Sequence, residues 1–197
     1  MSVRIGLFGG RFDPIHNGHL IIAEFIREEL HLDKVIFIPA AMPPHKETRT
    51  DAGLRLHMVS ACTADNPFFE PSDIEIRRQG VTYSVDTIQE IKDSYQTFVP
   101  ELFWVMGEDN FVEFHKWKDP ERIRQLCRIV VFPRTAEQTA GRVDLPPDDV
   151  CFLKHAPFLE ISSTFVRNLI REGRSVKYLV PPQVQQIISK FGLYEDK

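Results

Sequence analysis

Apolar residues in this chain occur in two spacings: continuous short runs, and runs in which they recur three and four positions apart. The first continuous run covers residues 3–8 and ends at Gly9 and Gly10, which is typical of a buried strand that leads into a loop. Residues 18–30 show helical spacing, and residues 34–39 form a second continuous run. A strand, a helix and a strand within about forty residues predict a βαβ unit with a right-handed crossover.

The alternation of the two spacings continues through the rest of the chain. It predicts strands over residues 72–77, 102–106, 128–132 and 150–153, and helices over residues 54–64, 85–95, 120–126, 164–171 and 181–191. Residues 133–149 are polar and rich in Gly, Pro and Asp, which predicts a surface loop. Such alternation is typical of a doubly wound, Rossmann-like, mainly parallel α/β sheet with helices on both faces, on which the C-terminal helices pack. We expect residues 1–197 to form a single domain.

Composition and charge exclude several classes of protein. The chain has 197 residues, of which 43% are hydrophobic and 26% charged, enough for one buried core. A net charge of −4 and a pI of about 6.0 give no global positive field for a nucleic-acid partner. Its three cysteines, Cys62, Cys127 and Cys151, lack the spacing of a zinc site or a disulfide framework, and no apolar run reaches membrane-spanning length. We expect a cytoplasmic protein without a membrane partner; a homodimer is compatible with the sequence, which does not define the oligomeric state.

The first candidate functional segment is Gly-Gly-Arg-Phe-Asp-Pro-Ile-His-Asn-Gly-His, over residues 9–19. It lies between the first predicted strand and the first predicted helix, where ligands bind in open α/β sheets. Glycines let the backbone approach a phosphate, and the helix start adds N–H groups and a positive dipole end. His16 and His19 are three positions apart, so both can contact one polyphosphate if the helix starts between them. The alternative is that one histidine caps the helix and the other is a core residue.

The segment Ile-Ser-Ser-Thr-Phe-Val-Arg over residues 161–167 precedes another predicted helix. It is either an ordinary helix start, capped by Ser162 or Ser163 with a solvated Arg167, or a second anion site. Two separate helix starts could hold a triphosphate from more than one side. The chain has neither a Gly-x-Gly-x-x-Gly fingerprint nor a Gly-Lys-Ser/Thr motif, so a dehydrogenase or a P-loop ATPase has no support.

These two segments together closely resemble the nucleotidyltransferase superfamily that is defined by His-x-Gly-His. Within it the chain is similar to the bacterial nicotinate-nucleotide adenylyltransferases, and the resemblance covers essentially the whole chain. Further matching segments follow in order: Pro-Pro-His-Lys at residues 43–46, Thr-Tyr-Ser-Val-Asp-Thr at 82–87, Val-Met-Gly-Glu-Asp-Asn at 105–110 and Phe-His-Lys-Trp at 114–117. Arg11 departs from the family, which usually has Ser or Thr there, and its role stays open.

The resemblance implies in-line transfer of AMP from ATP to nicotinate mononucleotide in NAD biosynthesis, with release of pyrophosphate. It implies that the catalytic residues are His16, His19, Lys46 and Arg167. ATP would be bound by Gly9, Gly10, Phe12, His16, Gly18, His19, Gly107, Asp109, Ile161, Ser162, Ser163 and Arg167. The pyridine nucleotide would be bound by Lys46, Thr82, Tyr83, Trp117 and Lys118, although composition alone favours a core position for Trp117. Mg²⁺ is expected to arrive with ATP, because we find no cluster of carboxylates for a dedicated metal site.

Two kinds of rival function remain for comparison. Within the superfamily, the rivals are enzymes that adenylate phosphopantetheine or transfer CMP to a polyol phosphate, and the segments around Thr82 and Trp117 argue against them. Outside it, the rivals are a non-catalytic nucleotide sensor and a fragment of a synthetase. The intact histidines argue against the sensor, and the absence of a basic extension argues against the synthetase.

Overall fold

The computed structural model describes residues 3–42, 50–78, 80–133, 150–153 and 155–195. Within these ranges it contains a six-stranded sheet in the order β3-β2-β1-β4-β5-β6, and all five neighbouring strand pairs are parallel. The strands are β1 (Arg4–Gly10), β2 (Lys34–Pro39), β3 (Phe69–Pro71), β4 (Glu101–Gly107), β5 (Arg128–Phe132) and β6 (Val150–Phe152). The chain leaves β1 toward β2 on one side and returns to β4 on the other, so the carboxyl ends of β1 and β4 form the topological switch point.

Both faces of the sheet are buried, because the apolar residues of each strand point alternately to two core clusters. On β4, for example, Phe103 and Val105 join one cluster, whereas Leu102 and Trp104 join the other. The first cluster contains buried residues of α1 (Asn17–Glu29), α2 (Ala52–Thr63), α7 (Ser163–Arg171) and α8 (Pro182–Phe191). The second contains residues of α3 (Ile74–Arg78), α4 (Ser84–Ser94), η1 (Phe114–Lys116) and α6 (Pro120–Leu126), and α5 (Glu108–Val112) directly follows β4.

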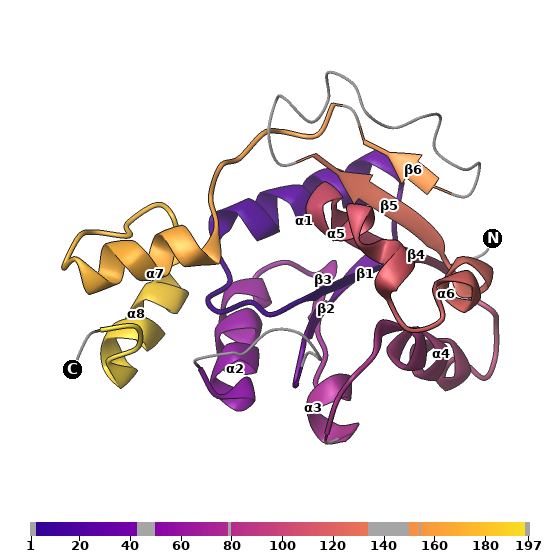
Figure 1. Cartoon of the computed structure of the whole chain (residues 1–197), viewed down its shortest axis with the longest axis horizontal. Coiled ribbons are helices and arrows are strands. Elements are labelled where there is room, and N and C mark those ends of the chain that lie inside the picture. Colours follow the sequence, from indigo (N-terminus) through magenta and orange to yellow (C-terminus); the bar gives the residue numbers. More distant parts are fainter. Residues whose placement is uncertain (1–2, 43–49, 79, 134–149, 154, 196–197) are drawn as a thin grey trace.

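The doubly wound fold predicted from the sequence is confirmed, including helices on both faces. Figure 1 shows α8 beside α2, and buried residues of α7 and α8 belong to the same core cluster as those of α1 and α2. None of the helices in the described ranges is both long and apolar enough to cross a bilayer. Most of the polar stretch predicted as a loop, residues 134–149, lies outside the described residues.

One predicted element is wrong. Residues 72–77 were expected to form a strand, but the strand β3 ends at Pro71 and residues 74–78 form the short helix α3. The consecutive residues Ile74 and Glu75 are both buried, which a half-buried strand does not permit because its successive side chains point to opposite faces. Glu75 is held by hydrogen bonds from the hydroxyls of Thr82 (2.7 Å) and Thr87 (2.9 Å), which lie 7 and 12 positions further along the chain.

Candidate active site

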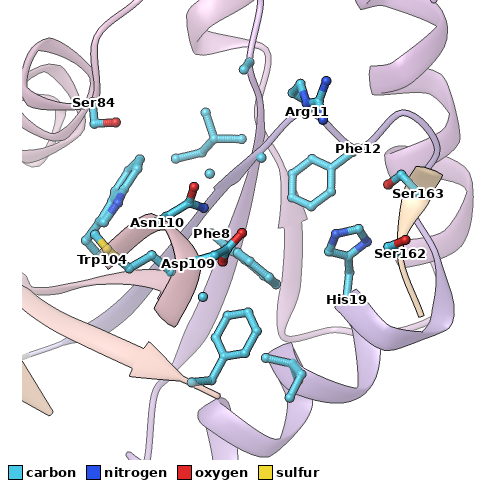
Figure 2. A pocket seen from close by; sticks show the side chains of 18 of the residues that line it. Phe8, Arg11, Phe12, His19, Ser84, Trp104, Asp109, Asn110, Ser162 and Ser163 are labelled. Atoms are coloured by element: carbon cyan, nitrogen blue, oxygen red, sulfur yellow. The ribbon is translucent and has the colours of Figure 1, made fainter. Parts of the chain in front are cut away.

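A cavity of about 810 Å³ opens at the carboxyl ends of the central strands, at the topological switch point. Its volume lies within the usual range of small-molecule sites. The strand ends contribute Gly9 and Gly10 from β1, Ile38 from β2, Met106 and Gly107 from β4, and Phe132 from β5. Figure 2 shows part of the cavity, with His19, Ser162 and Ser163 on one side and Trp104 and Ser84 on the other.

The histidine pair lies at the start of α1, where His16 is the N-cap residue. The backbone N–H of His16 donates to Nδ1 of His19 (3.2 Å), and the two rings stack with their centroids 3.6 Å apart. Because Nδ1 of His19 accepts a hydrogen bond, the neutral imidazole carries its proton on Nε2. His19 can therefore donate to an anion through Nε2, and both histidines line the cavity.

Two glycines are required by close contacts in this part of the site. A Cβ atom on Gly18 would lie 3.0 Å from Nδ1 of His16, so a side chain there would displace the ring. A Cβ atom on Gly9 would lie 2.8 Å from the indole of Trp104 on the neighbouring strand β4. Neither position has a positive φ, so the requirement is one of space rather than of backbone conformation.

Phe12 supports the histidine pair from the loop between β1 and α1. It has a φ of 48° and is buried, and its ring packs edge-on against that of His19 with the centroids 5.1 Å apart. Phe8 makes a similar edge contact with His19 at 6.0 Å. Arg11, whose role the sequence left open, also lines the cavity (Figure 2).

A second helix start, that of α7, meets the same end of the cavity. Ser162 is its N-cap, since Oγ accepts a hydrogen bond from the N–H of Phe165 (3.1 Å), which decides between the two serines proposed as caps. The hydroxyl of Ser163 instead donates to the carbonyl oxygen of Pro14 (2.9 Å) in the loop before α1. The N-termini of α1 and α7 therefore converge, and such ends carry free N–H groups and a positive dipole end.

Arg167 is placed differently from the expectation of a direct phosphate contact. Its Nη1 donates to the carbonyl oxygen of Asp13 (2.7 Å), its Nη2 donates to the hydroxyl of Thr164 (3.1 Å), and it is not among the residues that line the cavity. Asp13 is buried, and its Oδ1 accepts a hydrogen bond from the hydroxyl of Tyr194 (2.8 Å). In this structure Arg167 thus supports the backbone of the phosphate loop, which we define as residues 9–16.

The opposite end of the cavity is aromatic. Trp117 is half-buried and packs edge-on against Trp104 (centroids 6.4 Å apart) and Phe114 (5.5 Å). Tyr83 lies under Lys118, whose Nζ is 4.5 Å from the ring centroid and also donates to Asp86 (3.0 Å). A flat apolar ring with a cationic or anionic substituent fits such surroundings.

At this end of the cavity, both hydrogen-bond donors of Thr82, its hydroxyl and its backbone N–H, already have acceptors within the protein. Its hydroxyl donates to the buried Glu75, and its N–H donates to the carbonyl oxygen of Met42 (3.3 Å). Thr82 and Glu75 both line the cavity, so Thr82 contributes shape and position there. Between the two ends, Asp109 and Asn110 of α5 line the cavity (Figure 2), and partial burial together with the charge of Asp109 raises the pKa of the neighbouring Glu108.

The structure brings nearly all of the predicted site residues to this one cavity. The predicted residues that line it are Gly9, Gly10, Phe12, His16, Gly18, His19, Thr82, Tyr83, Gly107, Asp109, Trp117, Lys118, Ile161, Ser162 and Ser163. Arg167 lies outside the lining, and Lys46 lies outside the described residues. Trp104, Glu75 and Asn110 also line the cavity, but the sequence did not single them out as site residues. Trp104 and Glu75 lie within segments that were predicted to be strands.

Among the residues that the structure describes, no group of three His, Cys, Asp or Glu side chains is arranged to hold a metal ion. The carboxylates among the residues that line the cavity are Glu75, Asp109 and Glu113. Mg²⁺ prefers several oxygen ligands and commonly obtains them from substrate phosphates and water. The cavity supplies such oxygen donors from its own carboxylates.

Comparison with known proteins gives a consistent picture. A model of the family described as Cytidylyltransferase-like matches residues 7–169. A protein of Thermoanaerobacter sp. (strain X514), named "Probable nicotinate-nucleotide adenylyltransferase", is 40% identical over 202 residues, which cover 98% of this chain and 95% of that protein. A protein of Geotalea daltonii with the same name is 41% identical over 217 residues, which cover 98% and 99%.

Solved structures share the fold. The nicotinic acid mononucleotide adenylyltransferase of Plasmodium falciparum, solved in complex with NaAD, has a TM-score of 0.79 at 17% identity and matches over 98% of both chains. The same enzyme in complex with APC has a TM-score of 0.76 at 16% identity, again over 98% of both chains. These similarities establish the architecture across the whole chain.

Proposed function

Because this chain belongs to the Cytidylyltransferase-like family and, within it, to the nicotinate-nucleotide adenylyltransferases, we propose that it transfers AMP from ATP to nicotinate mononucleotide. The products are nicotinate adenine dinucleotide and pyrophosphate, a step of NAD biosynthesis. One observation carries the proposal: a single cavity has two converging helix N-termini and a histidine pair at one end and an aromatic wall at the other.

The chemistry is one in-line displacement. A phosphate oxygen of nicotinate mononucleotide attacks the α-phosphorus of ATP, a new P–O bond forms, and the bond to the bridging oxygen of the β-phosphate breaks. Pyrophosphate leaves with the electron pair of that bond. The attacking phosphate is already an anion at neutral pH, so the protein needs no strong base and acts through position and charge. Proximity alone can supply roughly 7 to 11 kcal/mol.

We assign the triphosphate to the end of the cavity formed by the two helix starts. His19 donates from Nε2, since its Nδ1 is occupied by the N–H of His16. The N-terminus of α7 adds donors at the same end of the cavity. Gly9, Gly10 and Gly18 allow the backbone to approach the phosphates. Lys46 and Arg167 remain proposed phosphate ligands, and Arg167 would have to exchange its contact with Asp13 for one with the nucleotide.

We assign the pyridine ring to the aromatic end, where Trp117 supplies a face for stacking. The segment from Thr82 to Ser84 leads into α4, whose N-terminus lies beside the cavity and favours a carboxylate over a neutral amide. Mg²⁺ bound to ATP would neutralise charge on the phosphates. We place the reaction in the cytoplasm, where ATP and mononucleotides are available together.

The proposal is tested by measuring pyrophosphate release from MgATP with three acceptors in parallel: nicotinate mononucleotide, nicotinamide mononucleotide and phosphopantetheine. We expect the nicotinate compound to be preferred and nicotinate adenine dinucleotide to form in equal amount to pyrophosphate. The variant His19→Ala is expected to lose on the order of 10² to 10³ in turnover, the usual effect of removing one preorganised donor.

Each alternative outcome has a definite meaning. Preference for phosphopantetheine or for the amide would keep the chemistry and reject the substrate. Binding of ATP without release of pyrophosphate from any acceptor would identify a nucleotide sensor. Near-normal turnover of His19→Ala would reject the role of the histidine pair.

A further inference from the structure

Behind the phosphate loop lies an arginine that the reaction scheme does not use. Arg55, in the first turn of α2, is the largest fully buried side chain in the described part of the chain, with 0% exposure. Its guanidinium donates to three backbone carbonyl oxygens: Nη1 to Arg11 (2.7 Å), Nε to Thr50 (3.1 Å) and Nη2 to Ala41 (3.3 Å). One planar group thus connects three separate stretches of backbone.

The three acceptors belong to the surroundings of the cavity. Arg11 is part of the phosphate loop, and both Arg11 and its neighbour Phe12 line the cavity. Ala41 follows β2 directly after Ala40, another lining residue, and Thr50 precedes α2. Arg55 itself is not among the lining residues, so it acts on the cavity only through the backbone that it holds.

The direction of these carbonyl groups matters for an anionic ligand. A carbonyl oxygen carries partial negative charge and would repel a triphosphate, whereas the N–H groups of the loop attract it. Two further carbonyl oxygens of the same loop accept side-chain hydrogen bonds, that of Asp13 from Arg167 and that of Pro14 from Ser163, which itself lines the cavity. Side chains therefore hold three carbonyl oxygens of the loop, those of Arg11, Asp13 and Pro14, and so fix the direction in which the loop presents its N–H groups.

Keeping a guanidinium in this position is costly, which argues that it does more than fill space. Burial lowers the pKa of Arg55, and the nearby carboxylate of Asp13 partly offsets this effect. A well-packed apolar side chain of similar volume often gives equal or greater stability than a buried charge. The arginine supplies what an apolar residue cannot, a rigid fork of donors that fixes several carbonyl groups relative to one another.

We propose that Arg55 is a positioning residue for the nucleotide: it locks the phosphate loop to the backbone of Ala41 after β2 and of Thr50 before α2, and so presets the triphosphate end of the cavity. This inference rests on the proposed function, because it deepens the role of the same site. Lysine at this position keeps the charge but not the fork, and methionine keeps much of the volume but no donor.

The test compares Arg55→Lys and Arg55→Met with Met58→Ala, a control that opens a cavity in the same helix at another fully buried residue, one that makes none of these loop contacts. For each protein, thermal denaturation followed by circular dichroism gives the folded fraction at 25 °C. Titration calorimetry gives the Kd of MgATP, and steady-state assays give kcat and the KM of ATP. Because the Kd of ATP is measured without acceptor, this readout does not depend on the identity of the second substrate.

We expect Arg55→Met to lose about 10-fold to 100-fold in ATP affinity or kcat per folded molecule, the scale on which misplacement of about 1 Å acts. Arg55→Lys should fall between it and the wild type, and Met58→Ala should keep wild-type values per folded molecule. If Arg55→Met does not fold, Arg55→Lys alone carries the comparison. Wild-type Kd and kcat in a folded Arg55 variant, or equal losses in Met58→Ala, would overturn the inference. Failure of the wild type to adenylate nicotinate mononucleotide would instead reject the proposed function.

Discussion

Replacing Gly9 by alanine tests whether the contact between β1 and Trp104 shapes the cavity. The new Cβ atom would lie 2.8 Å from two atoms of the indole, whereas an ordinary contact begins at 3.4 Å. The indole is 3% exposed and lies in the core of one face of the sheet, so it cannot swing into solvent. It must retreat by about 0.6 Å, or β1 and β4 must separate by a similar distance.

The cost in stability follows from overpacking of a dense core. Adding a methyl group to such a site typically costs about 1 to 3 kcal/mol. For a protein of this size, each kcal/mol lowers the Tm by roughly 2 to 4 °C. We therefore expect Gly9→Ala to be folded at 25 °C, with a Tm lowered by about 2 to 12 °C.

The cost in activity should be larger than the loss of stability explains. Trp104 lines the cavity and contacts Trp117, so a shift of its ring changes the surface on which the pyridine ring is proposed to stack. A shift of about half an ångström at a reacting centre corresponds to roughly a tenfold loss. We expect this loss to appear mainly in the KM of nicotinate mononucleotide, with the KM of ATP changed less.

The matched control is Gly6→Ala in the same strand. Its Cβ would meet Leu32 at 2.9 Å and Val35 at 3.3 Å, an overlap of similar size on the opposite face of the sheet. Both variants should lose stability, but only Gly9→Ala should lose nucleotide affinity. Equal kinetic constants in the two variants, measured on folded protein, would refute the argument that the Gly9 contact shapes the site.

Two further predictions concern stability and reactivity. Ser162→Ala removes the N-cap of α7 and should cost about 1 kcal/mol, seen in calorimetry as a Tm lowered by roughly 2 to 4 °C; an unchanged Tm would show that the cap is redundant. Burial raises the pKa of Cys62 and of Cys127 to about 12, so at pH 8 both thiols should react with a disulfide reagent far more slowly in native protein than in urea, and rapid native labelling of either would contradict their burial. Because these pKa values are raised on folding, their ionisation should lower stability as the pH rises from about 9 to about 12.

The core of the fold could be predicted from the sequence because its signals are local. The run that ends at Gly9 and Gly10 and the helical spacing after Gly18 became β1 and α1. Residues 72–77 misled the prediction because Ile74 and Ile76 alternate as in a strand. In the structure Glu75 of α3 accepts hydrogen bonds from the hydroxyls of residues 82 and 87, and the alternation of Ile74 and Ile76 gives no sign of these contacts.

The site likewise has features that local sequence signals predict and features that depend on contacts formed on folding. Motifs placed the histidine pair and the serines of α7 at the cavity, since helix starts and glycine loops are readable in a sequence. The orientation of Arg167 toward Asp13 and the burial of Arg55 could not be predicted, because each depends on which carbonyl oxygens come within reach after folding. Trp104 could not be recognised as a site residue, because it lies in an apolar strand in which Phe103 and Val105 are equally hydrophobic.

The hydrogen bond between Asp13 and Tyr194 spans 181 positions of the sequence. A ribosome makes Asp13 well before Tyr194, which follows α8 and leaves the exit tunnel after it. This hydrogen bond to the phosphate loop therefore forms only after the residues between the two positions have been synthesised. During translation, the phosphate loop thus gains this support only when the segment after α8 has emerged from the ribosome.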